Sequence, residues 1–319
     1  MGRYLIHRVF FLLISFVAAL LVIFVLLRLL PGDPANALLP ADASPEQITA
    51  AKAKVGSGLP LARQMTVWFT GIFRGDFGES YISGVPVAPE VFSRLGVTIP
   101  LTLISFVISA LLASVIGFIA AYKNGRWYGA VLTAFTQIGI GIPIFWVGIL
   151  FVWIFALRLH ILPSGGWPME GWRNPEAALR SLILPAATIV FMMSATLARY
   201  IRTSVLNVLD SGYIRTSRSL GFSQVSSFLL HGIRNAYVPV ISILGIELSS
   251  TLLGAVVVEN IFSLPGLGSM LTKAIAQHDY PSIQGILLTT TFLVLVIGFI
   301  ADVIQRILDP RLRSPHGGE

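Results

Sequence analysis

Residues 211–239 read SGYIRTSRSLGFSQVSSFLLHGIRNAYVP, and this stretch is the key to the arrangement of the whole chain. It is basic, with Arg215, Arg218 and Arg234, yet it lies between two segments that are apolar enough to cross a bilayer. Lys and Arg collect in the cytoplasmic loops of membrane proteins. We therefore expect residues 211–239 to lie on the cytoplasmic side of a membrane.

The first half of this stretch predicts a short helix. A turn is expected at residues 210–212, because Asp, Ser and Gly follow one another there. On the helix that follows, Tyr213, Ser217 and Leu220 are predicted to share one face. The two arginines of the helix then point away from that face.

Gly221 is expected to end this short helix, since a glycine just past the last helical residue accepts the left-handed backbone that closes many helices. A second helix is expected to begin at Ser223 and to run toward the next apolar segment. Two short helices joined at a glycine on the cytoplasmic side form a surface on which another protein can dock.

Composition shows that the chain belongs in a membrane. Charged residues make up 12% of its 319 residues, about half of the roughly 25% usual in soluble domains. A transmembrane helix needs about 20 mostly apolar residues. Six such runs are present, at residues 9–29, 97–121, 130–157, 181–202, 236–258 and 281–304. The sequence thus predicts an all-α integral membrane protein with six transmembrane helices, the first of them too long to be a cleaved signal peptide.

The charges between these runs predict the orientation. With six spans both termini lie on one side, and the side that holds residues 205–235 carries most of the Lys and Arg found in short loops. Both termini are therefore expected in the cytoplasm, and residues 31–94 form a long outer loop. No internal repeat or linker is visible, which favours a single transmembrane domain over residues 1–319.

The outer loop contains its own helix signals. Ser44, Pro45 and Gln47 predict a helix start with a capping box. A second helix is indicated by an apolar stripe of Leu61, Met65, Trp68, Phe69 and Ile72. This helix can rest on the outer leaflet, receive a binding protein or simply pack as a cap over the spans.

Several positions predict local irregularity. Gly139, Gly141 and Pro143 in the third run indicate either close helix packing or a hinge. Pro185 in the fourth run is interpreted as part of a helix start. Residues 263–268 are not expected to form a regular helix, because they contain a proline and two glycines.

Motifs for other kinds of chemistry are missing from the sequence. The net charge of +7 is dispersed among span ends, so nucleic acid is not expected as a partner. No phosphate-binding Gly-x-x-x-x-Gly-Lys-Ser/Thr motif, His-Glu-x-x-His or Gly-x-Ser-x-Gly occurs. The five histidines show no metal-ligand spacing, and His278-Asp279 is interpreted as a surface turn rather than a metal contact.

Residues 213–221, followed by Arg234-Asn235-Ala236 and Pro239, resemble the cytoplasmic coupling loop of ABC importer permeases. More narrowly, they are similar to the dipeptide/oligopeptide/nickel permease family. Within that family the chain resembles the first of the two permeases, the B-type subunit. The family usually has alanine at positions 217 and 219 and lysine at 220, where this chain has Ser217, Ser219 and Leu220. The resemblance continues in order through residues 30–34, 74–78, 259–262, 265–268, 279–281 and 309–311.

This resemblance implies an ABC importer type I permease fold and a transport subunit that is not an enzyme. It implies a second permease, which forms a heterodimer with this chain, and two further subunits that bind the ATP. It also implies an extracytoplasmic substrate-binding protein and a location in a bacterial or archaeal cell membrane. The implied substrate is a di- or oligopeptide, while nickel, a sugar or another small solute stays open. The residues implied to couple to the ATPase are Tyr213, Arg215, Thr216, Ser217, Arg218, Gly221, Phe222, Arg234 and Asn235.

The translocation pathway is predicted around the fifth span. Glu247 is its one carboxylate, and at the centre of a membrane helix an acidic residue costs about 2.5–3.5 kcal/mol, so it should face protein or water. Helical spacing predicts that Ser250, Thr251, Gly254 and Val258 share its face. The resemblance adds a re-entrant stretch near the pathway mouth. The pathway candidates are Glu247, Thr251, Glu259, Pro265 and Gly266.

Three interpretations of Glu247 stay open at this stage. It can attract the amino terminus of a peptide, pair with a basic group of the partner permease, or be a protonated acid hydrogen-bonded between helices. A different class of protein, an ion-coupled secondary carrier with Glu247 as its ion site, is also open, although such carriers often show the internal repeats that this chain lacks. A membrane-embedded enzyme would need a catalytic set, and none is assembled in the sequence.

Overall fold

The computed structural model describes residues 2–29, 35, 38–39 and 42–308. The motifs at residues 30–34 and 309–311 lie outside these described residues. Within them the regular structure is helical, with one isolated β-bridge between Glu79 and Pro86. The chain divides into two compact units, one from residues 1–98 and 265–295 and the other from residues 99–264 and 296–319.

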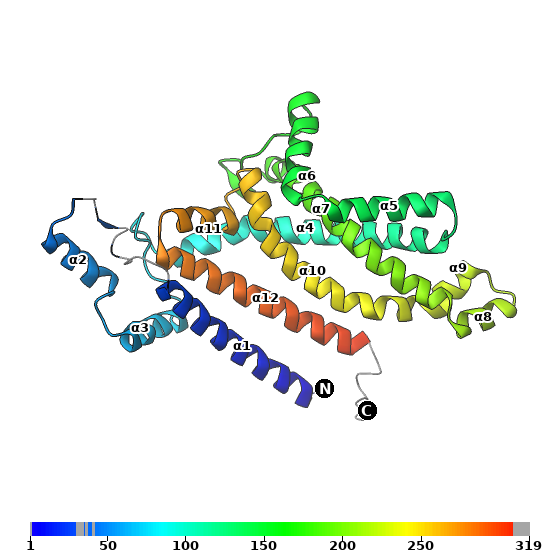
Figure 1. Cartoon of the computed structure of the whole chain (residues 1–319), viewed down its shortest axis with the longest axis horizontal. Helices are drawn as coiled ribbons and strands as arrows, with labels where there is room; N and C mark the ends of the chain where they lie inside the picture. Colours follow the sequence, from blue (N-terminus) through cyan, green and yellow to red (C-terminus); the bar gives the residue numbers. More distant parts are fainter. Residues whose placement is uncertain (1, 30–34, 36–37, 40–41, 309–319) are drawn as a thin grey trace. The chain divides into compact units, whose positions relative to one another are not determined.

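The first unit combines the N-terminal part of the chain with a later segment that includes α11 and the first part of α12. It contains α1 (Gly2–Leu29), α2 (Pro45–Val55), α3 (Leu61–Phe73), the start of α4 (Val87–Tyr122), α11 (Leu267–Ala276) and most of α12 (Tyr280–Leu308) (Figure 1). One buried cluster joins α1 to α11 and α12 through Ile23, Leu27, Ala274, Tyr280 and Ile283. A second joins α4 to α11 and α12 through Val87, Val91, Leu267, Met270 and Ile286.

The predicted helices of the outer loop are present. The Ser44 side chain accepts from the Gln47 backbone N–H at 3.3 Å, and the Gln47 side chain accepts from the Ser44 N–H at 2.8 Å, so the capping box is confirmed. In α3, Trp68 is half-buried against Phe24 of α1, with ring centroids 5.7 Å apart. No α3 residue is fully buried, so this helix packs on α1 along one side only.

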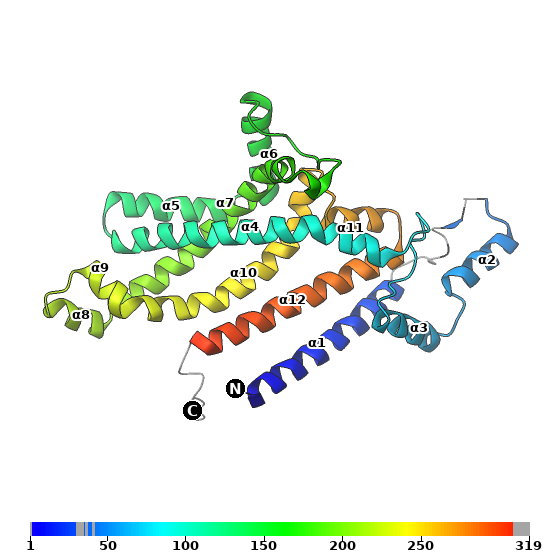
Figure 2. The same cartoon turned by 180° about the vertical axis from the view of Figure 1, so that it is seen from behind.

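The second unit has α7 at its centre. It contains the rest of α4, α5 (Trp127–Gly141), α6 (Ile144–Phe151), a π-helical turn (Val152–Arg158), a 3-10 turn (Gly171–Arg173) and α7 (Pro175–Leu209). The chain continues through α8 (Gly212–Ser219), α9 (Gln224–Ser227), a second π-helical turn (Phe228–Gly232) and α10 (Ile233–Ile261). Helix α7 packs against α5, α6 and α10, and α8 and α9 lie together at the end of α7 where α10 begins (Figures 1 and 2).

The core of the second unit reaches the short helix α8. Its buried members come from α4, α7, α8, the second π-helical turn and α10: Ala113, Ala121, Met193, Leu197, Ala198, Ile201, Val205, Val208, Ile214, Phe228, Ala236 and Val240. Burial of apolar side chains stabilises the fold by roughly 25 cal/mol per Å² of surface removed from water. Because Ile214 belongs to this core, α8 is anchored to the spans and is not a free loop.

Five helices of the described chain are long and apolar enough to cross a membrane. A sixth span results if α5 and the segment Ile144–Arg158, which is α6 with the π-helical turn after it, are counted as one. Those two segments meet at a bend of 103°, so residues 130–157 form two helices, as in a broken span or a re-entrant loop. The break falls at Ile142 and Pro143, since proline has no N–H for the helical ladder. Gly139 also serves close packing, because a Cβ there would lie 2.8 Å from that of Ala195.

Helix α4 begins at Val87, so the end of the predicted outer loop is helical, and its polar first part carries the Glu90–Arg94 ion pair of 3.0 Å. Two predicted helix boundaries need correction. Pro185 is not at a helix start, because α7 begins at Pro175 behind the capping side chain of Asn174. The irregular backbone after α10 ends at Gly266, and Leu267 already belongs to α11.

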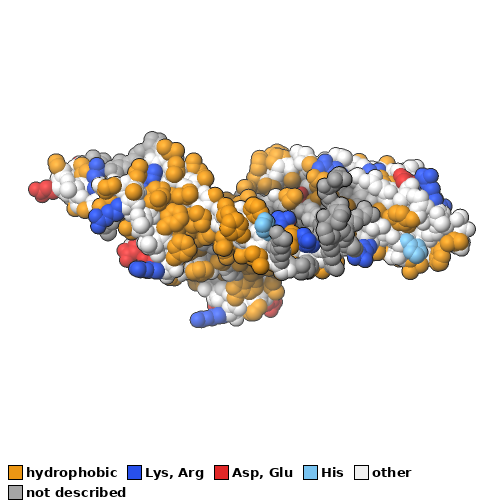
Figure 3. All heavy atoms as spheres, turned by 90° about the horizontal axis from the view of Figure 1, so that it is seen from below, with side chains coloured by type: hydrophobic (Ala, Val, Ile, Leu, Met, Phe, Trp, Pro, Cys, Tyr) orange, Lys and Arg blue, Asp and Glu red, His pale blue; other side chains and the backbone are white. Residues whose placement is uncertain are grey.

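The exterior of the helices is apolar. Exposed side chains of α1 include Ile6, Phe10, Leu13 and Leu26. Figure 3 shows apolar side chains spread over broad parts of one face, with Lys and Arg in small groups. Large contiguous apolar surfaces are rare on soluble monomers. This exterior suits a hydrocarbon environment and agrees with the membrane class that composition predicted.

Candidate functional site

The basic stretch at residues 211–239 forms α8, α9, the second π-helical turn and the start of α10. Ile214 and Ser217 are buried, whereas Tyr213 is 41% and Leu220 74% exposed. Of Tyr213, Ser217 and Leu220, which were predicted to share one face, only Ser217 is therefore on the buried side of α8. The reason is tertiary: Ile214 fills the core beside Val208 and Phe228, and this contact sets the rotation of α8.

Gly221 ends α8 as predicted. Its φ of +94° is one that L side chains rarely adopt. The Phe222 N–H donates to the Ser217 carbonyl at 3.4 Å, and the Gly221 N–H donates to the Arg218 carbonyl at 3.0 Å. These two bonds are the Schellman arrangement, which satisfies carbonyls that a helix end would otherwise leave open. The second helix begins behind Ser223, whose side chain accepts from the Ser226 N–H at 3.1 Å.

Two buried contacts hold α8 against the following segment. The Ser217 hydroxyl donates to the Ser227 hydroxyl at 3.0 Å, and both residues are buried. Gly232 permits the close approach, since a Cβ at this position would lie 2.8 Å from Val208 Cγ1 and 3.4 Å from Ile214 Cδ1. Sequence reasoning missed Ser227 and Gly232. Their only signal was small residue size ahead of an apolar span.

Ser217→Ala is expected to loosen α8, because it leaves the buried Ser227 hydroxyl without its partner at a cost of about 1–3 kcal/mol. Amide hydrogen exchange across residues 212–219 measures this loosening. Ser217→Ala combined with Ser227→Ala removes both hydroxyls and should restore most of the protection. Equal exchange in the single variant and the parent protein would show that the bond contributes nothing.

The outer surface of α8 is basic and partly apolar. Arg215 and Arg218 are exposed, and neither side chain has a hydrogen-bond or ion-pair partner in the described part of the chain. Leu220 and Phe222 are exposed beside them. Thr216 turns its hydroxyl back to the Gly212 carbonyl at 3.1 Å. The surface thus has two unpaired cations and two apolar side chains, a combination suited to a protein partner.

Arg234 and Asn235 make contacts within the chain. The Asn235 amide donates to the Tyr213 hydroxyl at 3.2 Å, and Arg234 donates to the Leu308 carbonyl at 3.2 Å. These neighbouring residues connect the start of α10 to α8 and to the end of α12. Sequence reasoning grouped them with the surface that meets a partner, and their role as internal connections needed the structure.

Glu247 and Thr251 lie together at a cavity of about 150 Å³. Thr196, Ser250 and Gly254 also line it, with a wall of Ile144, Ile189, Met192 and Met193. The predicted face of Glu247, Ser250, Thr251 and Gly254 therefore does line a cavity, while Val258 is buried elsewhere. The methionines and Thr196 come from α7 and could not be paired with Glu247 from spacing along α10 alone.

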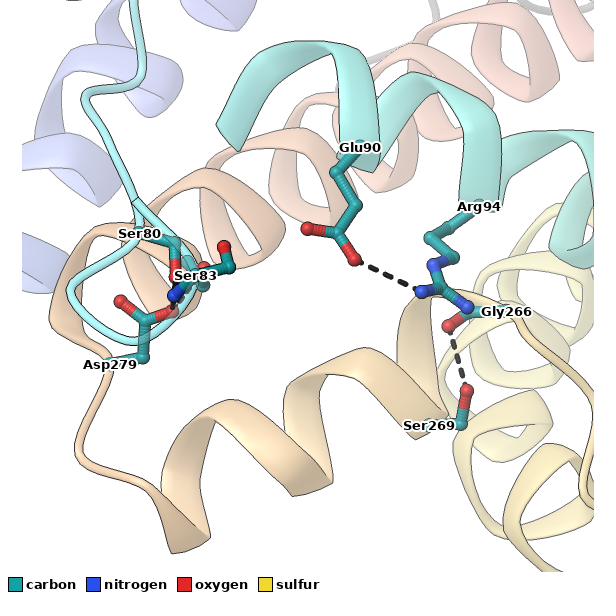
Figure 4. Close-up of polar contacts among 8 residues, drawn as sticks. Ser80, Ser83, Glu90, Arg94, Gly266, Ser269 and Asp279 are labelled. Atoms are coloured by element: carbon teal, nitrogen blue, oxygen red, sulfur yellow. Dashed lines mark hydrogen bonds and ion pairs between the residues drawn. The ribbon is translucent and has the colours of Figure 1, made fainter. Parts of the chain in front are cut away.

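The other three pathway candidates lie apart from this cavity's lining. Glu259, near the end of α10, is fully buried. Pro265 and Gly266 belong to the first unit and form the turn before α11, where the Gly266 carbonyl accepts from the Ser269 hydroxyl at 3.0 Å (Figure 4). No group of three His, Cys, Asp or Glu side chains that could hold a metal occurs among the described residues.

Asp279 is a structural anchor in the first unit, and the prediction of a surface turn was wrong for it. Its side chain is buried and accepts from the Ser80 hydroxyl at 2.6 Å (Figure 4). It also accepts from the Tyr81 N–H at 2.9 Å and the Ser282 hydroxyl at 2.7 Å. These bonds tie the loop before α4 to the start of α12. His278 beside it is exposed. Buried carboxylates need such partners, which explains why Asp279 is placed here.

The structure has the features of a membrane transport subunit. These are long apolar helices, an exposed basic helix between two of them, and a cavity with a carboxylate in one span. The chain belongs to the family described as the binding-protein-dependent transport system inner membrane component, whose model matches residues 113–314. The N-terminal model of the same transport systems matches residues 1–102. The protein is therefore a multi-pass inner membrane permease of an ABC importer and not its catalytic subunit. Such a permease works with partner ATPase and binding-protein components.

Relatives of known name extend over nearly the whole chain. A putative peptide transport system permease protein of Brucella abortus is 38% identical over 290 residues, 91% of this chain and 92% of the relative. A probable peptide ABC transporter permease protein of Sinorhizobium fredii is 32% identical over 317 residues, 98% of this chain and 100% of the relative. A glutathione transport system permease protein of Salmonella choleraesuis is 33% identical over 313 residues, 98% and 99% of the two chains.

Solved structures confirm the predicted fold class. A chain of an amino acid ABC transporter crystallised with histidines matches with a TM-score of 0.53 at 18% identity, covering 69% of this chain and 94% of that one. A chain of the MetNI methionine ABC transporter in an inward-facing form matches with a TM-score of 0.57 at 15% identity, covering 69% and 96%. At such identities the likeness concerns the fold alone.

Proposed function

We propose that this permease forms, with a second and different permease, the membrane pathway for di- or oligopeptides. The observation that carries the proposal is the 38% identity over 91% of the chain to a putative peptide transport permease. The relatives from Sinorhizobium fredii and Salmonella choleraesuis, named for peptide and glutathione transport, support the same substrate class. Glu247 and Thr251 are assigned to the pathway, with Glu259, Pro265 and Gly266 as further candidates.

In this proposal α8 is the helix that receives the movement of the ATPase. Two ATP-binding subunits bind the ATP, and this chain needs no cofactor of its own. Arg215, Arg218 and Phe222 are exposed on α8 or just behind it, where they can contact an ATPase subunit. The core contact of Ile214 and the Asn235–Tyr213 hydrogen bond then carry the displacement to α7 and α10.

Uptake measurements in a reconstituted importer test this function. The permease is combined with its partner permease, ATPase and binding protein in proteoliposomes, and labelled dipeptides, longer peptides and nickel are compared. We expect ATP-dependent peptide uptake. Nickel uptake without peptide uptake would identify the alternative cargo, and uptake by this chain without an ATPase would instead indicate a secondary carrier.

The proposed orientation places both termini and α8 in the cytoplasm. Reporter fusions along the chain test it, because the enzyme reporters are active on one side of the membrane only. A cytoplasmic signal is expected at Asn124, Ser211 and Pro310, the last of which lies outside the described residues. An outer signal is expected at Ala43, Gly166 and Lys273. An outer signal at Ser211 would remove α8 from the ATPase and contradict its proposed role.

A further inference from the structure

Glu247 lies at the midpoint of α10, the helix from Ile233 to Ile261. It is fourteen positions from each end, which is about 21 Å of helix on either side at roughly 1.5 Å per residue. A carboxylate inside a membrane span is costly to place, and such groups mark solute or ion pathways in membrane proteins. The question is therefore what this carboxylate contacts.

Within the described residues, the Glu247 carboxylate has no hydrogen-bond or ion-pair partner. The Thr251 hydroxyl, one turn further along α10, is already used: it donates to the Glu247 backbone carbonyl at 2.7 Å and to Met193 Sδ at 3.3 Å. The interpretation of Glu247 as an acid hydrogen-bonded between helices therefore has no support in this structure.

The surroundings of the carboxylate favour a cation. The cavity presents as a second oxygen the Ser250 hydroxyl, which is exposed and has no hydrogen-bond partner in the described part of the chain, while Ile144, Ile189 and Met192 supply an apolar wall. A negative charge attracts a positive one more strongly beside such a low-dielectric wall than in water. Arg199 of α7 forms no ion pair with Glu247 among the described residues and lies over the Tyr200 ring, 5.3 Å from the ring centroid.

We propose that this cavity is a subsite for a primary ammonium group of the transported solute. The carboxylate of Glu247 and the hydroxyl of Ser250 accept hydrogen bonds from the ammonium, and the methionine and isoleucine wall contacts the adjoining carbon chain. The ammonium can be the amino terminus of a peptide or a lysine side chain. This inference rests on the proposed peptide function, and it assigns the substrate chemistry of one site in the pathway.

The chain contains no cysteine, so a single introduced cysteine reports on this cavity without a background. The variant Ser250→Cys in the assembled importer is treated with a cationic and with an anionic methanethiosulfonate reagent of similar size. Rates are corrected for the reagents' rates with a free thiol. We expect the cationic reagent to react about tenfold faster than the anionic one, as local charge focusing of this kind allows. Adding Glu247→Gln should bring the two rates close together, and Glu247→Asp should keep the preference.

Met169→Cys is the control, since Met169 is fully exposed in the segment between the α6 and α7 helices and does not line the cavity. Its ratio of rates should not respond to Glu247→Gln. An unchanged ratio at Ser250→Cys after loss of the carboxylate would overturn the proposal. So would the absence of reaction with either reagent, because Glu247 would then be closed off from water, as expected if it pairs with the partner permease.

Uptake by the assembled importer distinguishes the two sources of the ammonium. Glu247→Gln should reduce uptake of all peptides with a free amino terminus if that group binds, and only of lysine-containing peptides if the side chain binds. Equal uptake of both classes by the variant and the parent protein would contradict the subsite. A parent importer that carries no peptide would refute the proposed function, and the cysteine reaction rates would still test the cation site separately.

Discussion

Replacing Gly221 with valine is expected to reduce uptake at least tenfold while the protein still inserts into the membrane. The backbone of Gly221 has a φ of +94°, and among the described residues no heavy atom beyond its chain neighbours lies within 4 Å of a Cβ built there. The effect therefore comes from backbone strain and not from a clash. Forcing a side chain into a sparsely populated conformation costs about 1–3 kcal/mol. A β-branched residue is among the least tolerant, so α8 would lose its Schellman ending and its fixed position against α9.

Gly221→Asn is the matched control, because asparagine accepts positive φ angles far better than valine does. We expect it to retain most of the uptake. Insertion is followed by the amount of protein in the membrane fraction, and coupling by co-purification of the ATPase subunits. Full activity of Gly221→Val would show that the end of α8 need not keep this conformation during transport.

Arg218→Glu is expected to abolish uptake and to weaken ATPase assembly. Arg218 is exposed, and its guanidinium has no partner in the described part of the chain, so it is available for a charge-assisted hydrogen bond across an interface. Reversing the charge replaces an attraction by a repulsion, and truncating one partner of a buried interfacial charge pair already costs about 2–5 kcal/mol. The fold should survive, because the buried face of α8 consists of Ile214 and Ser217.

Two variants show whether this effect is specific. Arg218→Lys keeps the charge and should retain part of the uptake, although it loses the planar two-pronged donor of arginine. Arg173→Glu reverses another exposed arginine, outside the α8–α9 region, and should leave ATPase assembly unchanged. Normal uptake with Arg218→Glu would remove Arg218 from the interface and leave the family membership untouched.

Local signals in the sequence were enough for the helices and several of their ends. Apolar runs of sufficient length predicted the membrane class, because the bilayer requires about 20 apolar residues whatever the rest of the chain does. The capping box at Ser44 and the glycine ending at Gly221 were also correct. Both depend on hydrogen bonds within a few residues, and such contacts follow directly from the order of side chains.

Contacts between distant segments could not be predicted in this way. Packing of Ile214 against Val208 and Phe228 set the rotation of α8, and helical spacing alone had favoured another face. Asp279 was taken for part of a surface turn because its partners Ser80 and Tyr81 lie almost 200 residues away. The third apolar run bends by 103° at Ile142 and Pro143, and the sequence had left open whether this position is a hinge or only a site of close helix packing.

The pathway site shows the same division between sequence and structure. The order of residues along α10 was sufficient to place Glu247, Ser250, Thr251 and Gly254 on one face, since this needs only the helical period. The tertiary structure alone brought Met192, Met193 and Thr196 of α7 opposite that face and left the carboxylate without a partner among the described residues. Periodicity determines which side chains of one helix lie together, and the packing of a second helix decides what they meet.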